Sequence, residues 1–220
     1  MVHLDTENQV LEVNITEMWH MILSQLSKSQ LALSNFDKNI VKNVQVNDKM
    51  IKTYKLKIDK DCENTIIHIN NEIVNLRFVL VVLKINHNLE RISDYAYNIS
   101  KLIDEMESPF SEELLKSSRI MEMYDIILGL LVDTLASFEN KNKEFAKTVF
   151  GKDKILNKIN KVASQKVADY IISKPSEVKM AMNTLSIIRK LERVGDYILN
   201  ITKELSFFME ASEKKMPSKN

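Results

Sequence analysis

Apolar residues recur along most of the chain at the spacing that gathers them on one face of an α-helix. Between residues 10 and 35 they fall three or four positions apart, with Met18 and Ile22 near the centre of the stripe, which predicts an amphipathic helix. The same period predicts five further helices, over residues 38–69, 73–107, 111–138, 145–171 and 175–208. Asp37 is expected to cap the second helix, and the polar residues 1–9 are expected to fray.

Turn-forming residues are scarce, which favours helices over strands. The chain has 220 residues with three Gly and three Pro, whereas the many tight turns of a β-protein require these residues. The composition is that of an ordinary soluble protein, with 45% hydrophobic and 28% charged residues. The net charge of +1 gives no overall field that would attract nucleic acid or an anionic membrane. We therefore expect an all-α protein that binds no nucleic acid.

Cysteine usage and hydropathy indicate the compartment. The single cysteine, Cys62, excludes an internal disulfide and a cysteine-based metal cluster, and it fits a reducing cytoplasm. The first residues show no basic region followed by an apolar core, so no signal peptide is expected. The longest apolar run, from Phe78 to Leu83, is far too short to span a bilayer. The sequence therefore predicts a cytoplasmic protein without direct membrane insertion.

One short motif occurs twice and divides the chain into halves. Residues 90–94 read Glu-Arg-Ile-Ser-Asp, and residues 192–196, at an offset of 102, read Glu-Arg-Val-Gly-Asp. Each copy lies in the last long helix of its half, and flanking positions match at the same offset. We therefore expect two tandem three-helix bundles, with six long helices related by an internal pseudo-twofold repeat. The expected units are residues 1–107 and 108–212, followed by a disordered tail over 213–220.

Each copy of the motif places two carboxylates four residues apart, Glu90 with Asp94 and Glu192 with Asp196. This spacing stacks both groups on one face of a helix, about 6 Å apart along its axis, where like charges repel each other. A bound cation would remove that repulsion. Carboxylate oxygens suit magnesium, manganese or iron, and zinc less well without His or Cys. The alternative is a solvated acidic groove with ordinary ion pairs, each worth under about 1 kcal/mol.

The arginine of each motif has two candidate roles. Arg91 and Arg193 are expected to pair with the neighbouring carboxylates and orient them. Bidentate binding of a phosphate is the alternative, because a planar guanidinium matches its geometry, although no Gly-rich phosphate cradle accompanies either arginine.

Other polar side chains are assigned to the surface. Lysines give the helix over residues 38–69 a basic outer face, formed by Lys49, Lys52, Lys55, Lys57 and Lys60. Glu17 and His20 form a Glu-x-x-His motif that occurs once, whereas a di-iron carboxylate bundle needs two such motifs and two further Glu. His87 lies one turn before Glu90, and a lone surface histidine is the simpler interpretation.

The doubled motif resembles that of the PhoU family, the accessory and regulatory proteins of bacterial high-affinity phosphate transport. The resemblance extends over almost the whole chain, through Phe36-Asp37-Lys38, Asn47-Asp48, residues 56–63, Leu76-Arg77-Phe78 and residues 83–86. It implies two tandem three-helix bundles, often assembled as a homodimer, in a cytoplasmic protein that is not an enzyme. It also implies metal binding, because some relatives hold multinuclear iron or zinc clusters through their Glu-x-x-x-Asp motifs.

The resemblance adds Asp48 and Asp59 as further candidate ligands, because both match acidic positions on the second helix of the family's repeat. In the second half Asp153 matches Asp48, but Ser164 stands near the counterpart of Asp59. The second cluster therefore has fewer carboxylates. If one site alone holds metal, we expect it at the first motif, beside Glu90.

The resemblance also implies a regulatory role. The protein is expected to act between the ATPase subunit of the phosphate ABC transporter and the phosphate-sensing histidine kinase. It would restrain uptake and keep the phosphate-starvation response off when phosphate is plentiful. Two alternatives stay open: a carboxylate-bridged metalloprotein or metalloenzyme, and a free-standing relative of the cytoplasmic domain of a sodium–phosphate cotransporter.

Overall fold

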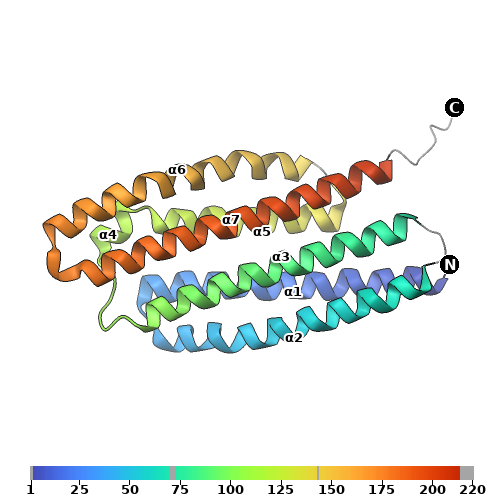
Figure 1. Ribbon diagram of the computed structural model, residues 1–220, viewed down its shortest axis with the longest axis horizontal. Helices are drawn as coiled ribbons and strands as arrows, with labels where there is room; N and C mark the ends of the chain where they lie inside the picture. The colour runs from blue at the N-terminus through green and yellow to red at the C-terminus, as the bar shows by residue number, and fades with distance from the viewer. Residues whose placement is uncertain (1, 70–72, 143, 214–220) are drawn as a thin grey trace.

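Six long helices make up two bundles that lie side by side along the longest axis of the molecule (Figure 1). The computed structural model describes residues 2–69, 73–142 and 144–213, and side chains over 6–69, 73–142, 148–149 and 151–210. The first bundle consists of α1 (Val2–Asn35), α2 (Lys38–His68) and α3 (Ile73–Asp104). The described residues form no strand, and the expected all-α fold of two tandem three-helix bundles is confirmed.

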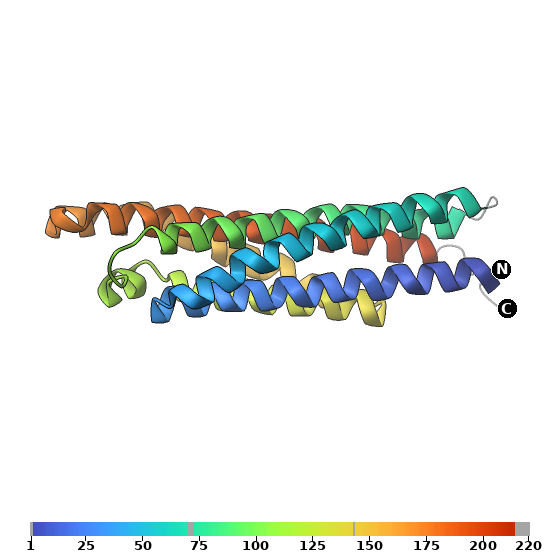
Figure 2. The ribbon, with the colours of Figure 1, turned by 90° about the horizontal axis from the view of Figure 1, so that it is seen from below.

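The second bundle has three long helices and two short elements. The long helices are α5 (Ile120–Asn140), α6 (Glu144–Ser173) and α7 (Val178–Glu213). The short elements are α4 (Glu112–Ser117), which lies at one end of the molecule (Figure 2), and the 3₁₀ turn η1 (Pro175–Glu177). None of the described helices is long and apolar enough to cross a lipid bilayer. The expected tail lies outside the described residues from position 214 onward.

The start of α2 follows the sequence expectation, and the start of α1 does not. Asp37 caps α2, because its side chain accepts hydrogen bonds from the backbone N–H groups of Asn39 (2.8 Å) and Ile40 (3.3 Å). The helix α1 begins at Val2, so the expectation of a frayed segment is wrong for residues 2–9, while residue 1 lies outside the described residues. Local composition marks that segment as polar, but it has a neighbouring helix to pack against.

The single helix expected over 111–138 is divided into α4 and α5. Arg119 has a φ of 57°, in the left-handed region, and this conformation ends one helix before the other begins. The hydroxyls of Ser117 and Ser118 donate to the carbonyls of Leu114 and Leu115, each at 3.3 Å. Serine side chains that bond to nearby carbonyls compete with helix formation, which accounts for a break that contains neither Gly nor Pro.

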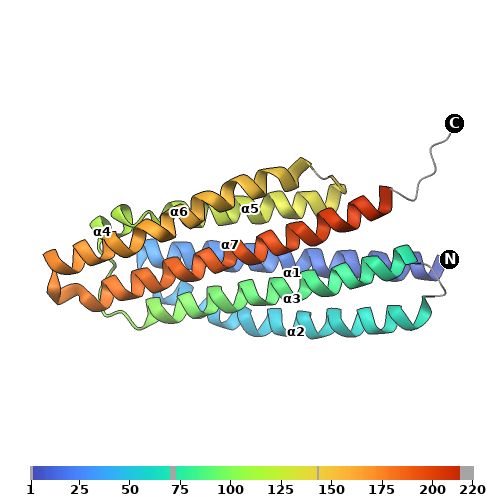
Figure 3. The ribbon, with the colours of Figure 1, turned by 45° about the horizontal axis from the view of Figure 1, so that its top comes forward.

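The two bundles meet along α3 and α7, which run antiparallel through the middle of the molecule (Figure 3). Ring centroids are 5.9 Å apart both in the pair Phe78–Phe208 and in the pair Tyr95–Tyr197. The ammonium group of Lys84 lies 2.8 Å from the carboxylate of Glu204 on the same seam. The second copy of the motif therefore faces the first across this helix pair.

A second junction joins α1 to α5 through buried side chains. The fully buried indole of Trp19 donates a hydrogen bond to the carbonyl of Leu131 at 3.2 Å, and its ring stacks on Phe138 with centroids 6.2 Å apart. The hydroxyls of Ser29 and Tyr124, also buried, are 2.8 Å apart. Because these contacts cross between the bundles, the two halves share one continuous core.

Candidate functional site

The first acidic cluster lies between α2 and α3 and contains Asp48, Asp59, Glu90 and Asp94. Asp48 belongs to α2, and it is 3% exposed although it carries a carboxylate. Its oxygens accept hydrogen bonds from the hydroxyl of Ser93 on α3 at 3.0 Å and from the ammonium of Lys52 at 2.8 Å. These contacts supply the partners that a buried carboxylate requires.

Lys52 connects the two helices of this cluster. Its Nζ atom lies 2.8 Å from Asp48 on its own helix and 3.4 Å from Asp94 on α3. The pKa of Lys52 is raised above its ordinary value, chiefly by the hydrogen bond to Asp48, while partial burial acts in the opposite direction. Arg91 also pairs with Asp94, at 3.6 Å, as expected from the sequence. The ammonium group of Lys52 thus occupies the position of a bridging cation.

Asp59, the second α2 carboxylate of the cluster, has a lysine of its own. Its oxygens lie 2.7 Å from the ammonium of Lys55 and 2.8 Å from the amide nitrogen of Asn86 on α3. The hydrogen bond to Asp59 raises the pKa of Lys55, and the negative charges of Asp59 and Glu90 act in the same direction. Two of the four carboxylates in this cluster, Asp48 and Asp59, are therefore bound closely by lysines of α2. Lys52 also pairs with a third carboxylate, that of Asp94.

The second acidic cluster, between α6 and α7, contains Asp153, Glu192 and Asp196 and is built differently. Asp153 accepts a hydrogen bond from Asn157 at 3.1 Å, which is a neutral donor. Arg193 pairs with Asp196 at 3.1 Å and lies 3.9 Å from Glu192, and the positive charge of Lys203 lowers the pKa of Asp153.

The carboxylates of the second cluster disfavour one another's charge. Burial raises the pKa of Asp153, and the negative charge of Asp196 adds to that rise. The pKa of Glu192 is raised first by burial and then by Asp196, while Arg193 and a hydrogen bond from Asn160 lower it. Burial and the negative charge of Asp196 therefore outweigh the positive charges of Lys203 and Arg193, and the pKa values of Asp153 and Glu192 stay above their ordinary values.

Neither cluster has the arrangement of a metal centre. Among the residues with described side chains, no three His, Cys, Asp or Glu side chains converge closely enough to hold one ion. In the first cluster, lysine ammonium groups stand where a cation would bind. Metal ligation stays a prediction for Glu90, Asp94, Glu192, Asp196, Asp48, Asp59 and Asp153.

The sequence assigned Lys52 and Lys55 to the outer face of α2, where their side chains are 47% and 24% exposed, but it missed their contacts with carboxylates. Both lie at the border of α2 with α3, where they contact carboxylates of the first cluster. A signal was present in the sequence, because Lys52 follows Asp48 by four residues and Lys55 precedes Asp59 by four, and that spacing places oppositely charged groups together on a helix.

Other candidate chemistry lies apart from the clusters. Glu17 accepts a hydrogen bond from the hydroxyl of Tyr54 at 2.9 Å, and His20 is exposed on the same helix. Cys62 is buried, and burial raises the pKa of its thiol to about 12. Such a thiol is not a nucleophile near neutral pH.

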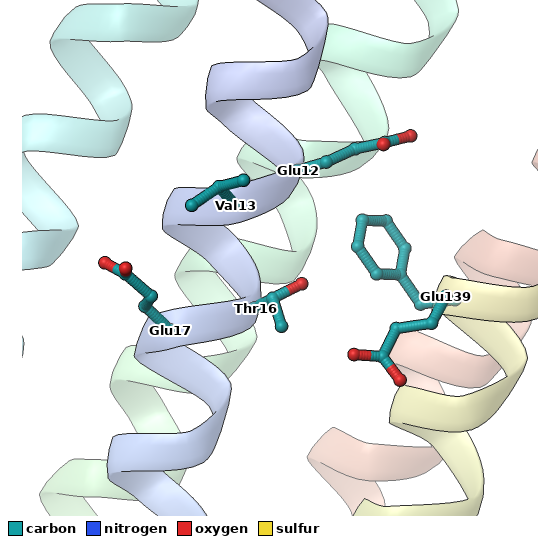
Figure 4. Close-up of a pocket in the computed structure, with 6 residues that line it drawn as sticks. Glu12, Val13, Thr16, Glu17 and Glu139 are labelled. Atoms are coloured by element: carbon teal, nitrogen blue, oxygen red, sulfur yellow. The ribbon is translucent and has the colours of Figure 1, made fainter.

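An acidic hollow of about 290 Å³ lies between α1 and α5. Figure 4 shows Glu12, Val13, Thr16 and Glu17 of α1 on one side and Glu139 of α5 on the other. The ring of Phe138 also lines it. Carboxylates around an apolar floor suit a basic side chain with an apolar stem better than a small anion.

Both halves of the chain match one protein-family model. The model describes the PhoU domain, and it matches residues 15–103 and residues 120–205. The chain belongs to the PhoU family. Each matched range contains one acidic motif, so the duplicated sequence pattern and the two bundles correspond to two PhoU domains.

Named members of the PhoU family are similar to this chain along nearly their whole length. Phosphate-specific transport system accessory protein PhoU homolog 1 of Thermotoga maritima is 24% identical over 215 residues, which is 97% of this chain and 92% of that protein. The PhoU homolog of Borreliella burgdorferi is 27% identical over 215 residues, or 96% of each chain. PhoU of Escherichia coli is 24% identical over 209 residues, covering 95% of this chain and 86% of its own.

Solved PhoU structures have the same fold. The phosphate transport system regulatory protein PhoU from Streptococcus pneumoniae gives a TM-score of 0.84 at 25% identity, over 94% of this chain and 97% of that one. PhoU from Pseudomonas aeruginosa gives a TM-score of 0.84 at 21% identity, over 94% and 99% of the two chains. The relatives are named as accessory or regulatory proteins and not as enzymes.

Proposed function

We propose that this protein is an accessory regulator of phosphate-specific transport. It acts as a cytoplasmic adaptor between the ATPase subunit of a phosphate ABC transporter and a phosphate-sensing histidine kinase, and it restrains uptake when phosphate is plentiful. The observation that carries this proposal is the match of both halves to the PhoU domain. The names of the relatives, which are phosphate-specific transport accessory proteins, support the same pathway.

Two surfaces support a role in binding other proteins. The α2 helix carries four apolar side chains that are 53% to 77% exposed, Val46, Met50, Leu56 and Ile67. At 100° per residue they fall within one third of the helix circumference, and exposed apolar groups in such a stripe mark contact sites for proteins. The acidic hollow between α1 and α5 offers a second, differently charged surface (Figure 4).

A complementation experiment tests the regulatory role. A bacterial strain that lacks its own PhoU-type gene would express this chain, together with a phosphate-starvation reporter gene, in phosphate-rich medium. We expect the chain to lower reporter expression at least several-fold and to slow phosphate uptake. Reporter expression equal to that of the empty vector, with folded protein present, would reject the proposal.

Charge reversal at the first motif tests whether the acidic face takes part in that role. The double variant Glu90→Lys/Asp94→Lys is expected to derepress the reporter while its far-UV circular dichroism stays helical. The matched control is Glu63→Lys/Glu107→Lys, which reverses two exposed charges elsewhere and should leave repression intact. Full repression by the first variant would show that the motif is not needed for regulation. The adaptor role itself is tested separately, by the complementation experiment.

The homodimer implied by the family resemblance is a separate proposal. Multi-angle light scattering of the purified chain checks it, and a mass near 25.5 kDa at all concentrations would reject it.

A further inference from the structure

The two acidic clusters differ at the same two positions in their α2 and α6 helices. An offset of 105 residues aligns Asp48 with Asp153, and the same offset aligns Lys52 with Asn157 and Lys55 with Asn160. The aspartate of each repeat is contacted by the side chain four residues later, although that side chain is charged in the first repeat and neutral in the second. Lys52 contacts Asp48 at 2.8 Å, and Asn157 donates to Asp153 at 3.1 Å. At this position the second repeat has a neutral amide where the first has an ammonium group, and Asn160, which aligns with Lys55, hydrogen-bonds Glu192.

The lysine positions in the first cluster are those of bridging counter-ions. The Nζ atom of Lys52 contacts carboxylates from both helices, Asp48 at 2.8 Å and Asp94 at 3.4 Å. Lys55 binds Asp59 at 2.7 Å, and Asn86 holds the same carboxylate from α3 at 2.8 Å. Asp48 and Asp59 are eleven residues apart on one helix, about 16 Å along its axis, so each lysine neutralises its own carboxylates. A divalent ion that ligated Asp48 and Asp94 would first have to displace the ammonium group of Lys52, and an ion at Asp59 would have to displace that of Lys55.

The buried carboxylate of the first cluster is also fixed from α3. Ser93 donates to Asp48 at 3.0 Å, whereas its counterpart in the second repeat is Gly195, which has no hydroxyl. A side chain at Gly195 would not fit there without movement, because its Cβ would stand 2.6 Å from Cδ1 of Leu156. Asp153 consequently has no donor of this kind from α7, and its oxygens are less constrained than those of Asp48.

We propose that Lys52 and Lys55 are the built-in counter-ions of the first repeat, and that they exclude a divalent metal ion from the cluster of Asp48, Asp59, Glu90 and Asp94. The first cluster then holds α2 against α3 without metal. Neutral Asn157 and Asn160 give the second cluster no equivalent counter-ion. This proposal reverses the order of the two sites expected from the sequence, which counted carboxylates and placed the lysines elsewhere.

Copying the second repeat into the first tests the proposal. In the double variant Lys52→Asn/Lys55→Asn, the two lysines are replaced by the residues that the second repeat has at these positions. Without the two ammonium groups, the carboxylates of Asp48 and Asp94 are free to turn toward a shared ion. Isothermal titration calorimetry with Mn²⁺ is therefore expected to show one additional equivalent that wild type does not bind. The melting temperature of the variant should fall in EDTA and rise again with Mn²⁺, whereas that of wild type should change less.

A charge-matched control separates local from general electrostatics. Lys49→Asn/Lys60→Asn removes two exposed lysines from the same helix, and it should bind Mn²⁺ as wild type does. If this control gains the same equivalent, net charge and not the position of Lys52 and Lys55 decides binding, and the proposal is wrong.

A second variant, made in the chain that keeps both lysines, tests the proposal independently of how the lysine variant folds. Glu90→Gln/Asp94→Asn should leave the Mn²⁺ stoichiometry of the wild-type chain unchanged. Loss of a bound equivalent in this variant would overturn the proposal, because it would place a metal in the first cluster beside the lysines. An unchanged stoichiometry in the folded Lys52→Asn/Lys55→Asn variant would overturn it as well.

Discussion

Asp48 is buried and Glu192 is partly buried, and their neighbours have opposite effects on the negative charge. Asp48 has an ammonium and a hydroxyl as partners, so its charge is matched where it is buried. Burial and the negative charge of Asp196 both disfavour the ionised form of Glu192 and raise its pKa. Burial alone therefore does not determine the chemistry of a carboxylate; the charged and polar groups around it do.

At the residue scale the sequence identified the carboxylates and missed their counter-ions. The i,i+4 spacing of Glu90 and Asp94 is visible in one helix, and so is the pairing of each motif arginine with its neighbours. Lys52 looked like an outer-face residue because a helical pattern shows which face is apolar but not which neighbour borders its edge. The contact of Lys52 with Asp94 depends on how α3 is rotated against α2, and no local pattern contains that information.

The raised pKa values in the second cluster predict how stability changes with pH. Asp153 and Glu192 bind their protons more tightly in the folded state than in the unfolded chain. The protonated carboxyl groups therefore stabilise the fold at low pH, and this contribution is lost as the pH rises above the ordinary pKa values of 3.8 and 4.5. We expect Glu192→Gln to be more stable than wild type at pH 7, by about 0.5 kcal/mol, with the difference vanishing near pH 4. Urea unfolding at several pH values measures it.

The control for that experiment is Glu139→Gln, which changes an exposed glutamate outside the cluster and should show no such pH-dependent gain. A Glu192→Gln variant that is less stable than wild type at pH 7 would contradict the expected repulsion.

At the scale of helices, the period of apolar residues located all six long elements, because each helix must bury a stripe against its bundle. The predicted helix ends were wrong where contacts outside that apolar stripe determine the structure. Residues 2–9 are polar, yet the amide of Asn8 donates to Asn75 of α3 at 3.1 Å and ties this segment to the bundle. The break before α5 depends on Arg119 adopting a positive φ, a conformation that local sequence does not favour in arginine.

The end of α5 has a similar conformation that a substitution can relieve. Lys141, the C-cap of α5, has a φ of 51°, which glycine adopts without steric cost. We expect Lys141→Gly to raise the free energy of unfolding by about 0.5–1 kcal/mol, since the left-handed conformation costs other residues more than glycine loses in entropy. Chemical denaturation followed by circular dichroism measures the change.

Helix-interior glycine provides the comparison for that prediction. Lys154→Gly, at an exposed position inside α6, should lower stability by about 1 kcal/mol. If Lys141→Gly destabilises the protein as much as Lys154→Gly does, the left-handed cap is not a source of strain.

On the scale of the whole molecule, the sequence repeat predicted two similar bundles but not how they attach. The attachment uses α3 against α7 and α1 against α5, and its central residues (Tyr95, Tyr197 and Trp19) lie outside the doubled five-residue motif, so the repeat did not single them out. Because Trp19 packs across to Leu131 and Phe138, the two halves are expected to unfold together.

Removal of that indole tests whether the halves unfold as one unit. Trp19→Ala should lower the free energy of unfolding by about 3–5 kcal/mol, the range for loss of a large buried aromatic side chain, while a single urea transition is kept. Far-UV circular dichroism is the measurement, because the variant has no other tryptophan to report by fluorescence. Phe207→Ala, at a side chain that is 66% exposed, should change stability by less than about 0.5 kcal/mol. Two separate transitions in wild type would contradict a shared core.

The pairing of Tyr95 with Tyr197 has a consequence for how such a protein can evolve. In a symmetric dimer of single repeats, each residue beside the axis meets its own copy, so every substitution is made on both sides at once. A single chain that carries both repeats is released from that rule. Ser93 and Gly195, or Lys55 and Asn160, can then differ within one molecule, and one half can lose a property that the other retains. Fusion of the repeats thus lets the halves specialise while the tyrosine pair still joins them as in a symmetric dimer.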